Sequence, residues 1–155
     1  MALVTAAQAR LHVPELSGTD EDTNLDTVIA RVGGAFARYC GYPPATVGVV
    51  PSMESVSRVL YIDGPGGRDL VVPVWPVTAI GSIYDSPDHS YGASHLVASG
   101  DYTLINGDQG LVELDYDAAH GGWSTGKRNV KATVTAGFVT VPADLQLAAV
   151  MAAVQ

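Results

Sequence analysis

The stretch VTAGFVTVPADLQLAAV, residues 134–150, changes its periodicity halfway. Its first residues, up to Gly137, have the character of a strand that is ending, and the residues after Pro142 are apolar at helical spacing. Proline suits the first turn of a helix, and the carboxylate of Asp144 complements the positive end of the helix dipole. The stretch therefore predicts a strand that leads into a closing helix over residues 141–155.

The predicted closing helix has almost no polar face. One side can pack on the apolar stripe of the N-terminal part, formed by Leu25, Val28, Ile29 and Val32. The other side has no partner that this chain obviously supplies, so we expect another chain to cover it. The apolar positions that this interpretation places in the helix are Leu145, Leu147, Val150, Met151 and Val154.

Residues 1–42 read as helical. Thr5 and Gln8 have the spacing of a capping box, which predicts a short helix that ends before Pro14. Thr19 is a candidate cap for a second helix, whose apolar stripe runs at steps of three and four residues to Tyr39. The pair Gly33–Gly34 lies inside it, and each glycine costs about 1 kcal/mol relative to alanine. The pair therefore indicates a close helix contact or a bend.

Residues 56–137 read as strands. A hairpin is predicted for residues 55–62 and 68–75 around the turn DGPGG, and a second one around NGDQG for residues 101–105 and 111–116. Residues 77–84 form a further predicted strand. Residues 129–137 alternate cleanly, with Val130, Ala132, Val134 and Ala136 on one face. The expected fold is α+β, with the N-terminal helices and the C-terminal helix packed together and an antiparallel β insertion between them.

Composition limits the classes of function. The chain has 155 residues, 47% of them hydrophobic, which suffices for the core of a single domain over residues 1–155. Eight basic against 16 acidic residues give a net charge of -8, which argues against a surface that grips nucleic acid. Cys40 has no second cysteine to pair with. We expect no signal peptide and no membrane span, since no apolar run approaches roughly 18 residues.

Candidate metal ligands have a second interpretation as surface residues. His89 and His95 could join Asp85 and Asp88 in one loop, but a polar surface loop rich in Ser, Asp and Pro is the favoured interpretation. No histidine has the spacing of a zinc motif.

The acidic residues of the second hairpin, Glu113, Asp115 and Asp117, could bind calcium, and a solvated strand face is favoured. We therefore expect no catalytic residue, no metal site and no cofactor.

The two tryptophans lead to different expectations. Trp75 lies in an apolar strand segment and is expected in the core. Trp123 lies in a glycine-rich loop, where it could anchor a partner or could cover the edge of the β insertion. Both alternatives stay open at this point.

The order of these segments resembles the head–tail connector (adaptor) proteins of tailed bacteriophages. The most specific part is a strand followed by TAGF, then VP and an apolar helix. One departure is that Tyr42 and Pro43 follow Gly41 where members often carry a basic residue, which puts a phosphate or acidic contact there in doubt. The matching segments are LVTAAQARLHV, TDEDTNLDTVIARV, FARYCGYP, DLVVPVWPVTAIGSIY, DYTLI with GLVEL, KATVTAGF and VPADLQLAAV.

The resemblance implies a structural protein of the virion neck, without catalysis. It implies a homo-oligomeric ring of about twelve copies joined head to tail. The ring would sit between the portal protein and a downstream stopper or tail protein, and genomic DNA would pass through it without sequence-specific binding. Assembly would take place in the host cytoplasm, and the closing helix would continue beyond Gln155 into a polar tail.

The expected portal and subunit interface consists of apolar positions of the helices, together with Trp123 if that side chain is exposed. The expected interface residues are Leu145, Leu147, Val150, Met151, Val154, Gly33, Gly34 and Trp123.

The alternative function is a β-rich binding module, for example for carbohydrate recognition, on a virion or cell surface.

Overall fold

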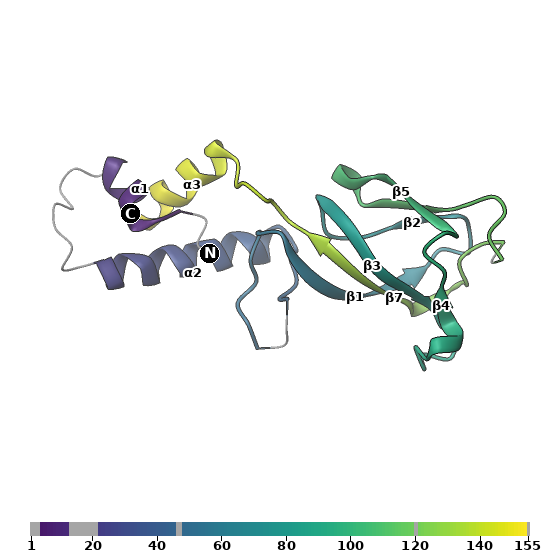
Figure 1. Ribbon diagram of the computed structural model, residues 1–155. Helices are drawn as coiled ribbons and strands as arrows, with labels where there is room; N and C mark the ends of the chain where they lie inside the picture. Colours follow the sequence, from purple (N-terminus) through teal and green to yellow (C-terminus); the bar gives the residue numbers. More distant parts are fainter. Residues whose placement is uncertain (1–3, 13–21, 46–47, 120, 155) are drawn as a thin grey trace. The chain divides into compact units, whose positions relative to one another are not determined.

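The computed structural model describes residues 4–12, 22–45, 48–119 and 121–154. The chain divides into two compact units, of which the first comprises Met1–Glu54 and Phe138–Gln155 and the second Ser55–Gly137. The first unit is helical and the second is built of antiparallel strands (Figure 1). The fold class is therefore α+β, as predicted from the sequence.

The helical unit contains α1 (Ala6–His12), α2 (Asp22–Tyr39) and α3 (Ala143–Val154). The predicted capping box of α1 is present: the Thr5 hydroxyl accepts a bond from the Gln8 backbone N–H, and the Gln8 side chain accepts one from the Thr5 N–H. These two bonds satisfy backbone donors that a helix start leaves unpaired. The predicted cap Thr19 lies outside the described residues. No helix among the described residues is long and apolar enough to cross a membrane.

α2 ends in a Schellman motif at Gly41. The Gly41 N–H donates to the Arg38 carbonyl and the Tyr42 N–H donates to the Ala37 carbonyl, at 3.0 and 2.8 Å. These bonds pair carbonyl groups that the helix end would otherwise leave free. Tyr42 is buried, so the motif turns the chain and adds an aromatic ring to the core.

The core of the helical unit lies between α2 and α3, which pack against each other. Ile29, Ala37, Ala149 and Val150 are buried in it. The predicted apolar stripe of α2 is only partly covered, because Tyr39 at its end is 91% exposed. The α2–α3 pair therefore leaves apolar surface in contact with water.

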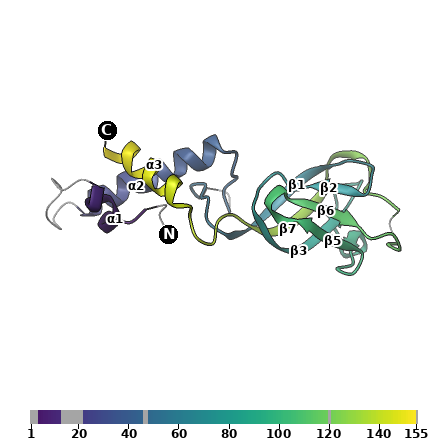
Figure 2. The same ribbon diagram turned by 90° about the horizontal axis from the view of Figure 1, so that it is seen from above.

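The β unit contains two sheets (Figure 2). One has the strand order β1-β7-β3-β4 and the other β2-β6-β5. The strands are β1 (Val56–Gly64), β2 (Asp69–Val71), β3 (Val77–Asp85), β4 (Leu96–Val97), β5 (Tyr102–Asn106), β6 (Leu111–Leu114) and β7 (Gly126–Ala136). Two short 3-10 helices, η1 (Ala93–His95) and η2 (Gly107–Gln109), lie in the connections.

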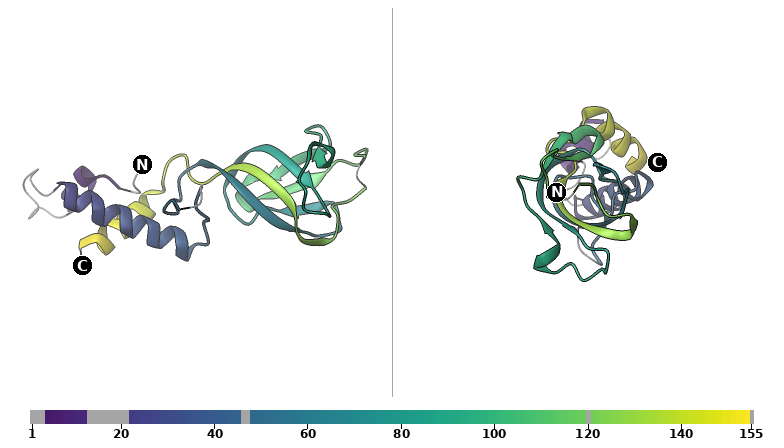
Figure 3. Two further views of the ribbon diagram at one scale, coloured as in Figure 1. Left: turned by 90° about the horizontal axis from the view of Figure 1, so that it is seen from below. Right: turned by 90° about the vertical axis from the view of Figure 1, so that its right-hand side faces the viewer.

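The long strand β7 pairs antiparallel with β1 on one side and β3 on the other (light green in Figure 3). The predicted hairpin over DGPGG is therefore wrong, because β1 pairs with β7 and β2 pairs with β6. After Gly64 the chain crosses to the other sheet, where the Gly67 carbonyl accepts a bond from the Trp123 N–H. The second predicted hairpin, β5–β6 around NGDQG, is confirmed.

The two sheets bury their inner faces in a common core. The predicted inward set of β7, Val130, Ala132, Val134 and Ala136, is fully buried. The alternation seen in the sequence therefore identified the core face of the central strand. The other sheet and its flanks contribute the buried side chains of Leu70, Val72, Val112 and Leu114.

A buried amide ties three segments of the β unit together. The Asn129 side chain accepts a bond from the Gly64 N–H and donates one to the Ser124 carbonyl, both at 2.8 Å. The Ser124 N–H in turn donates to the carboxylate of Asp85 at 2.8 Å. A Cβ atom on Gly64 would lie 1.8 Å from the Ser124 carbonyl oxygen, so only glycine lets the backbones approach this closely.

We predict that Gly64→Ala lowers the free energy of unfolding by about 1–3 kcal/mol, because the new methyl group must displace backbone in a packed region. Urea denaturation of the purified chain measures this. Gly67→Ala is the matched control in the same turn, since nothing lies within 4 Å of a Cβ there. Equal stability of the two variants would contradict this account of the turn.

Candidate functional site

The outward side of α3 exposes large apolar side chains. Leu147 is 44% and Met151 58% exposed, whereas Val150 is buried and Leu145 is half-buried. Val154 ends the helix, and its side chain is not among those described. Of the predicted interface positions on α3, Val150 thus belongs to the core of the unit, and Leu147 and Met151 form an exposed apolar surface.

An apolar groove runs beside this surface. It has a volume of about 480 Å³. Its lining consists of apolar and aromatic side chains, with Tyr39 almost fully exposed at its end. The residues that line the apolar groove are Val32, Ala35, Phe36 and Tyr39 from α2 and Ala152 from α3. The groove therefore leaves apolar surface in contact with water.

The pair Gly33–Gly34 is buried in α2. A Cβ on Gly34 would lie 2.4 Å from the Cγ1 atom of Val50. Gly34 therefore has a close contact, but with the segment that carries Val50 and not with a second helix. Participation of the glycine pair in an interface stays a prediction.

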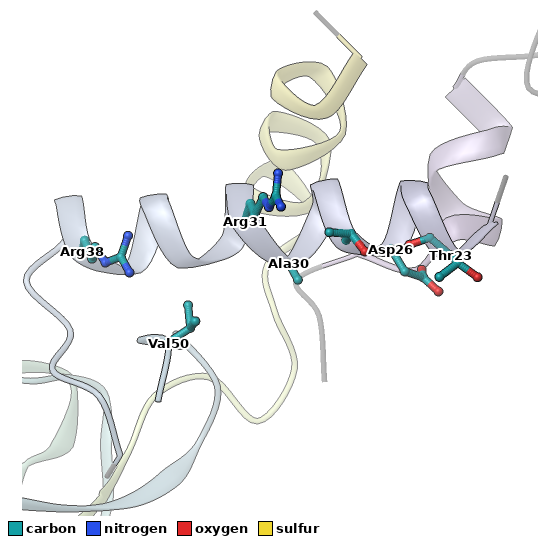
Figure 4. A pocket seen from close by; sticks show the side chains of 7 residues that line it. Thr23, Asp26, Ala30, Arg31, Arg38 and Val50 are labelled. Atoms are coloured by element: carbon teal, nitrogen blue, oxygen red, sulfur yellow. Dashed lines mark hydrogen bonds between the residues drawn. The ribbon is translucent and has the colours of Figure 1, made fainter. Parts of the chain in front are cut away.

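A second hollow lies on the opposite side of α2 (Figure 4). Its volume is about 570 Å³. Arg31 and Arg38 lie two turns apart at its rim, Asp26 lies toward the start of the helix, and Val50 points at the helix from the facing segment. Helical spacing puts this set and the groove set on different faces. α2 therefore presents an apolar surface on one side and a mixed-charge surface on the other.

The structure decides between the two alternatives for Trp123 and corrects the prediction for Trp75. Trp123 is only 2% exposed, and its indole N–H donates to the Arg68 carbonyl at 2.8 Å. It covers the core of the β unit, so a role as an exposed anchor is not what the structure has. Trp75 was expected in the core and is 52% exposed. Trp75 follows a short alternating segment in which Val72 and Val74 already point inward, so the next position points outward.

The histidine loop is held by bonds within itself and to β7. The ring of His89 bonds the Lys127 carbonyl at 2.8 Å, and the ring of His95 lies 3.3 Å from the Asp88 carboxylate. A bond from the Ser86 hydroxyl, followed by the Ser90 backbone N–H, lowers the pKa of the Asp88 carboxyl well below its usual range. Asp88 thus orders its own turn.

Asp85 lies apart from that turn, where it is buried and accepts the bond from Ser124. Within the described ranges, no group of three His, Cys, Asp or Glu side chains could hold a metal ion. His120 lies outside those ranges.

Of the three acidic residues predicted together, Glu113 lies on the outer face of β6, Asp115 directly follows that strand, and Asp117 lies in the turn beyond it. Glu113 pairs with Arg68 at 3.4 Å, and Asp115 accepts a bond from the Thr103 hydroxyl at 3.1 Å. Asp69 lies directly opposite Glu113 in the ladder between β2 and β6. We call the row Asp69, Glu113 and Asp115 the acidic face.

The other sheet carries a basic–aromatic face that the sequence alone did not predict. Lys131 on β7 lies between Tyr61 on β1 and Tyr84 on β3 in the strand register. The Lys131 ammonium lies 5.2 Å from the Tyr84 ring centroid, and the Arg128 guanidinium lies 5.2 Å from that of Tyr61. Alternation along β7 could have placed Lys131 outward, but only strand pairing brings the rings to it.

We predict that Val150→Asp and Met151→Asp differ in their effect on the thermal stability of the isolated protein. Val150→Asp buries an unpaired charge and should abolish cooperative folding or lower the melting temperature strongly. Met151→Asp places the same charge in water and should leave the melting temperature nearly unchanged. Thermal unfolding followed by circular dichroism distinguishes them, and a parallel loss in both would mean that Met151 is part of the core.

The chain shares its fold with solved proteins from phage-like particles. One match is a chain from the neck of an empty gene transfer agent (GTA) particle computed with C6 symmetry, at 20% identity and a TM-score of 0.63, over 95% of this chain and 73% of that one. A second is from the virion of a native GTA particle, at 18% identity and TM-score 0.61, over 95% and 74%. A third is from the neck of a native GTA particle computed with C12 symmetry, at 19% and 0.56, over 96% and 73%. No protein-family model and no curated protein matches the chain.

Proposed function

We propose that this protein is a structural subunit of the neck of a phage or phage-like particle, forming a ring between the portal and the tail or stopper. The observation that carries the proposal is the fold shared with a GTA neck chain across 95% of this sequence, which includes the helical and the β part alike. The order of segments in the sequence, independent of that comparison, resembles head–tail connectors.

The proposed ring has about twelve copies, joined by a heterologous interface that closes on itself. The C6 and C12 symmetries used for the similar neck chains support a cyclic arrangement of this kind. The copies would assemble in the host cytoplasm and remain in the virion neck. A structural role of this type needs no catalytic residue and no cofactor.

The proposed portal contact is the apolar groove together with Leu147 and Met151. Each of these two side chains and Tyr39 leaves a large apolar area in water, and burying it against a partner is favourable by about 25 cal/mol per Å². Gly34 meets Val50 on the opposite side of α2 and lies outside this surface. Trp123 is not part of the proposed contact, because its ring is already buried.

The proposed channel lets DNA pass without holding it. Each chain carries a net charge of -8, so a ring of copies repels a phosphate backbone at most of its surface. Repulsion and the absence of base readout would together favour movement of the genome through the ring.

We predict that the protein binds its cognate portal as a ring, visible by negative-stain electron microscopy and by co-sedimentation. Met151→Asp and Leu147→Asp should each reduce co-sedimentation by at least about tenfold, because a charge would be buried without a partner. Ala7→Asp adds the same charge at an exposed position of α1 and should bind like the wild type. A wild-type protein that forms no ring with the portal would overturn the proposed function.

A further inference from the structure

The β unit carries surfaces of opposite charge on its two sheets. The outer face of β1-β7-β3 holds the basic–aromatic face, and the outer face of β2-β6-β5 holds the acidic face. We propose that the basic–aromatic face of one copy docks on the acidic face of the next copy and forms the contact between neighbouring β units. This inference rests on the proposed ring and names one of its interfaces.

The basic–aromatic face is a continuous cluster of rings and cations. Tyr61 and Tyr91 meet edge to face with their centroids 5.3 Å apart. Lys131 lies over both Tyr84 and Tyr91, at 5.2 and 5.8 Å, and Arg128 lies over Tyr61. Tyrosine and arginine supply large contact areas and dominate the binding energy of protein interfaces. The cluster therefore has the composition of an interface core.

The backbone around this face is held in a fixed and uncommon conformation. His89, Tyr91 and Arg128 have φ angles of 58°, 49° and 52°, and they are the described non-glycine residues with positive φ. The Tyr91 hydroxyl donates to the Arg128 carbonyl, and the Asp63 carboxylate accepts from the Arg128 N–H. A left-handed conformation at such residues persists only where surrounding contacts enforce it, and it concentrates at functional sites.

Lys127 contributes little to the positive charge of this face. Its ammonium lies 2.7 Å from the Asp63 carboxylate, and that bond lowers the pKa of Asp63 and raises the pKa of Lys127. The pair is neutral as a whole. The unbalanced charge of the face therefore comes from Arg128 and Lys131.

The acidic face matches this pattern in charge and in apolar surroundings. Asp69 and Asp115 add two charges to the Glu113–Arg68 pair, which is neutral as a whole. Val71 on β2 and Ile105 on β5 are more than half exposed beside them. On the basic–aromatic face, Val59 is also exposed next to Tyr61. Each face thus sets charged groups beside exposed aliphatic side chains.

A second copy fits this face better than DNA does. Two unbalanced cations give few phosphate contacts, fewer than a duplex-binding surface uses. A copy of the same chain supplies two unbalanced carboxylates on the outer face of its smaller sheet. A head-to-tail ring also requires two different, complementary surfaces on every subunit, and the two sheets provide them.

Charge reversal on each face tests the pairing. The patch variant carries Arg128→Glu and Lys131→Glu, and the acid variant carries Asp69→Lys and Asp115→Lys, with Glu113 left to pair with Arg68. Either variant alone meets like charges at every junction, so ring assembly on the portal should fall more than about tenfold. In an equal mixture, a ring in which the two variants alternate joins opposite charges at every junction, and such rings should form.

Matched controls separate charge from folding. Arg128→Lys with Lys131→Arg keeps the charges and should assemble like the wild type. Asp108→Lys with Asp117→Lys makes the same change in net charge outside the strands of the acidic face and should also assemble. Thermal unfolding of every variant identifies any that assemble poorly because they do not fold. Where the patch variant does not fold, neutral Lys131→Gln replaces it, with a smaller expected loss of assembly.

The outcomes distinguish this inference from the proposed function. Rings of either reversed variant alone, with wild-type melting, would overturn the docking while the neck function stands. Loss in both variants without recovery in the mixture would also overturn it, because the faces would not be partners. Sedimentation of the mixture without portal should show association absent from either variant alone, whether or not the portal binds. Binding of a duplex oligonucleotide or a glycan that the patch variant loses, with rings of the patch variant intact, would assign the face to that ligand instead.

Discussion

The structure of the β unit depends on the backbone pairing of β7 with a strand on each side. Because β1 and β3 both bond to it, β7 has no free edge, and its residues must alternate between the core and the outer surface. The inward positions are small and branched residues that close the core against the second sheet. The outward positions include Lys131, which the same register places between two tyrosines. A shift by one residue would bury the lysine and expose the core.

The same strand delivers the chain to the helical unit. At Gly137 the backbone has a φ of 116°, which glycine adopts readily, and its N–H donates to the Pro76 carbonyl at 2.8 Å. The chain then reaches Pro142, whose carbonyl accepts the bond from the Gln146 N–H as α3 begins. Residues 134–150 thus combine the end of the central strand with the start of the helix. Some apolar residues of α3 are buried and others are exposed, because α2 covers only one side of α3.

The two units therefore offer surfaces of different physical character. The helical unit exposes apolar side chains around a groove, for which burial of area is the driving force. The β unit exposes charged and aromatic groups in register, for which complementarity sets specificity and orientation more than affinity. In the proposed function, the apolar surface meets a different protein and the charged surfaces meet copies of the same chain.

The local elements follow from the amino-acid sequence alone. Capping of α1 by Thr5 and Gln8, the alternation of Val130 to Ala136, the β5–β6 hairpin and the apolar character of α3 follow from interactions between near neighbours, and the structure has all of them. The tertiary structure sets which strands pair. The turn DGPGG is compatible with a hairpin, but Gly64 bonds to Asn129 and Gly67 bonds to Trp123, and the strands on its two sides belong to different sheets. The tertiary structure also decided that Trp123 is covered while Trp75 is not, and that Tyr61, Tyr84 and Lys131 meet. These outcomes depend on residues distant in the chain competing for the same burial and the same hydrogen bonds, which spacing along one chain does not encode.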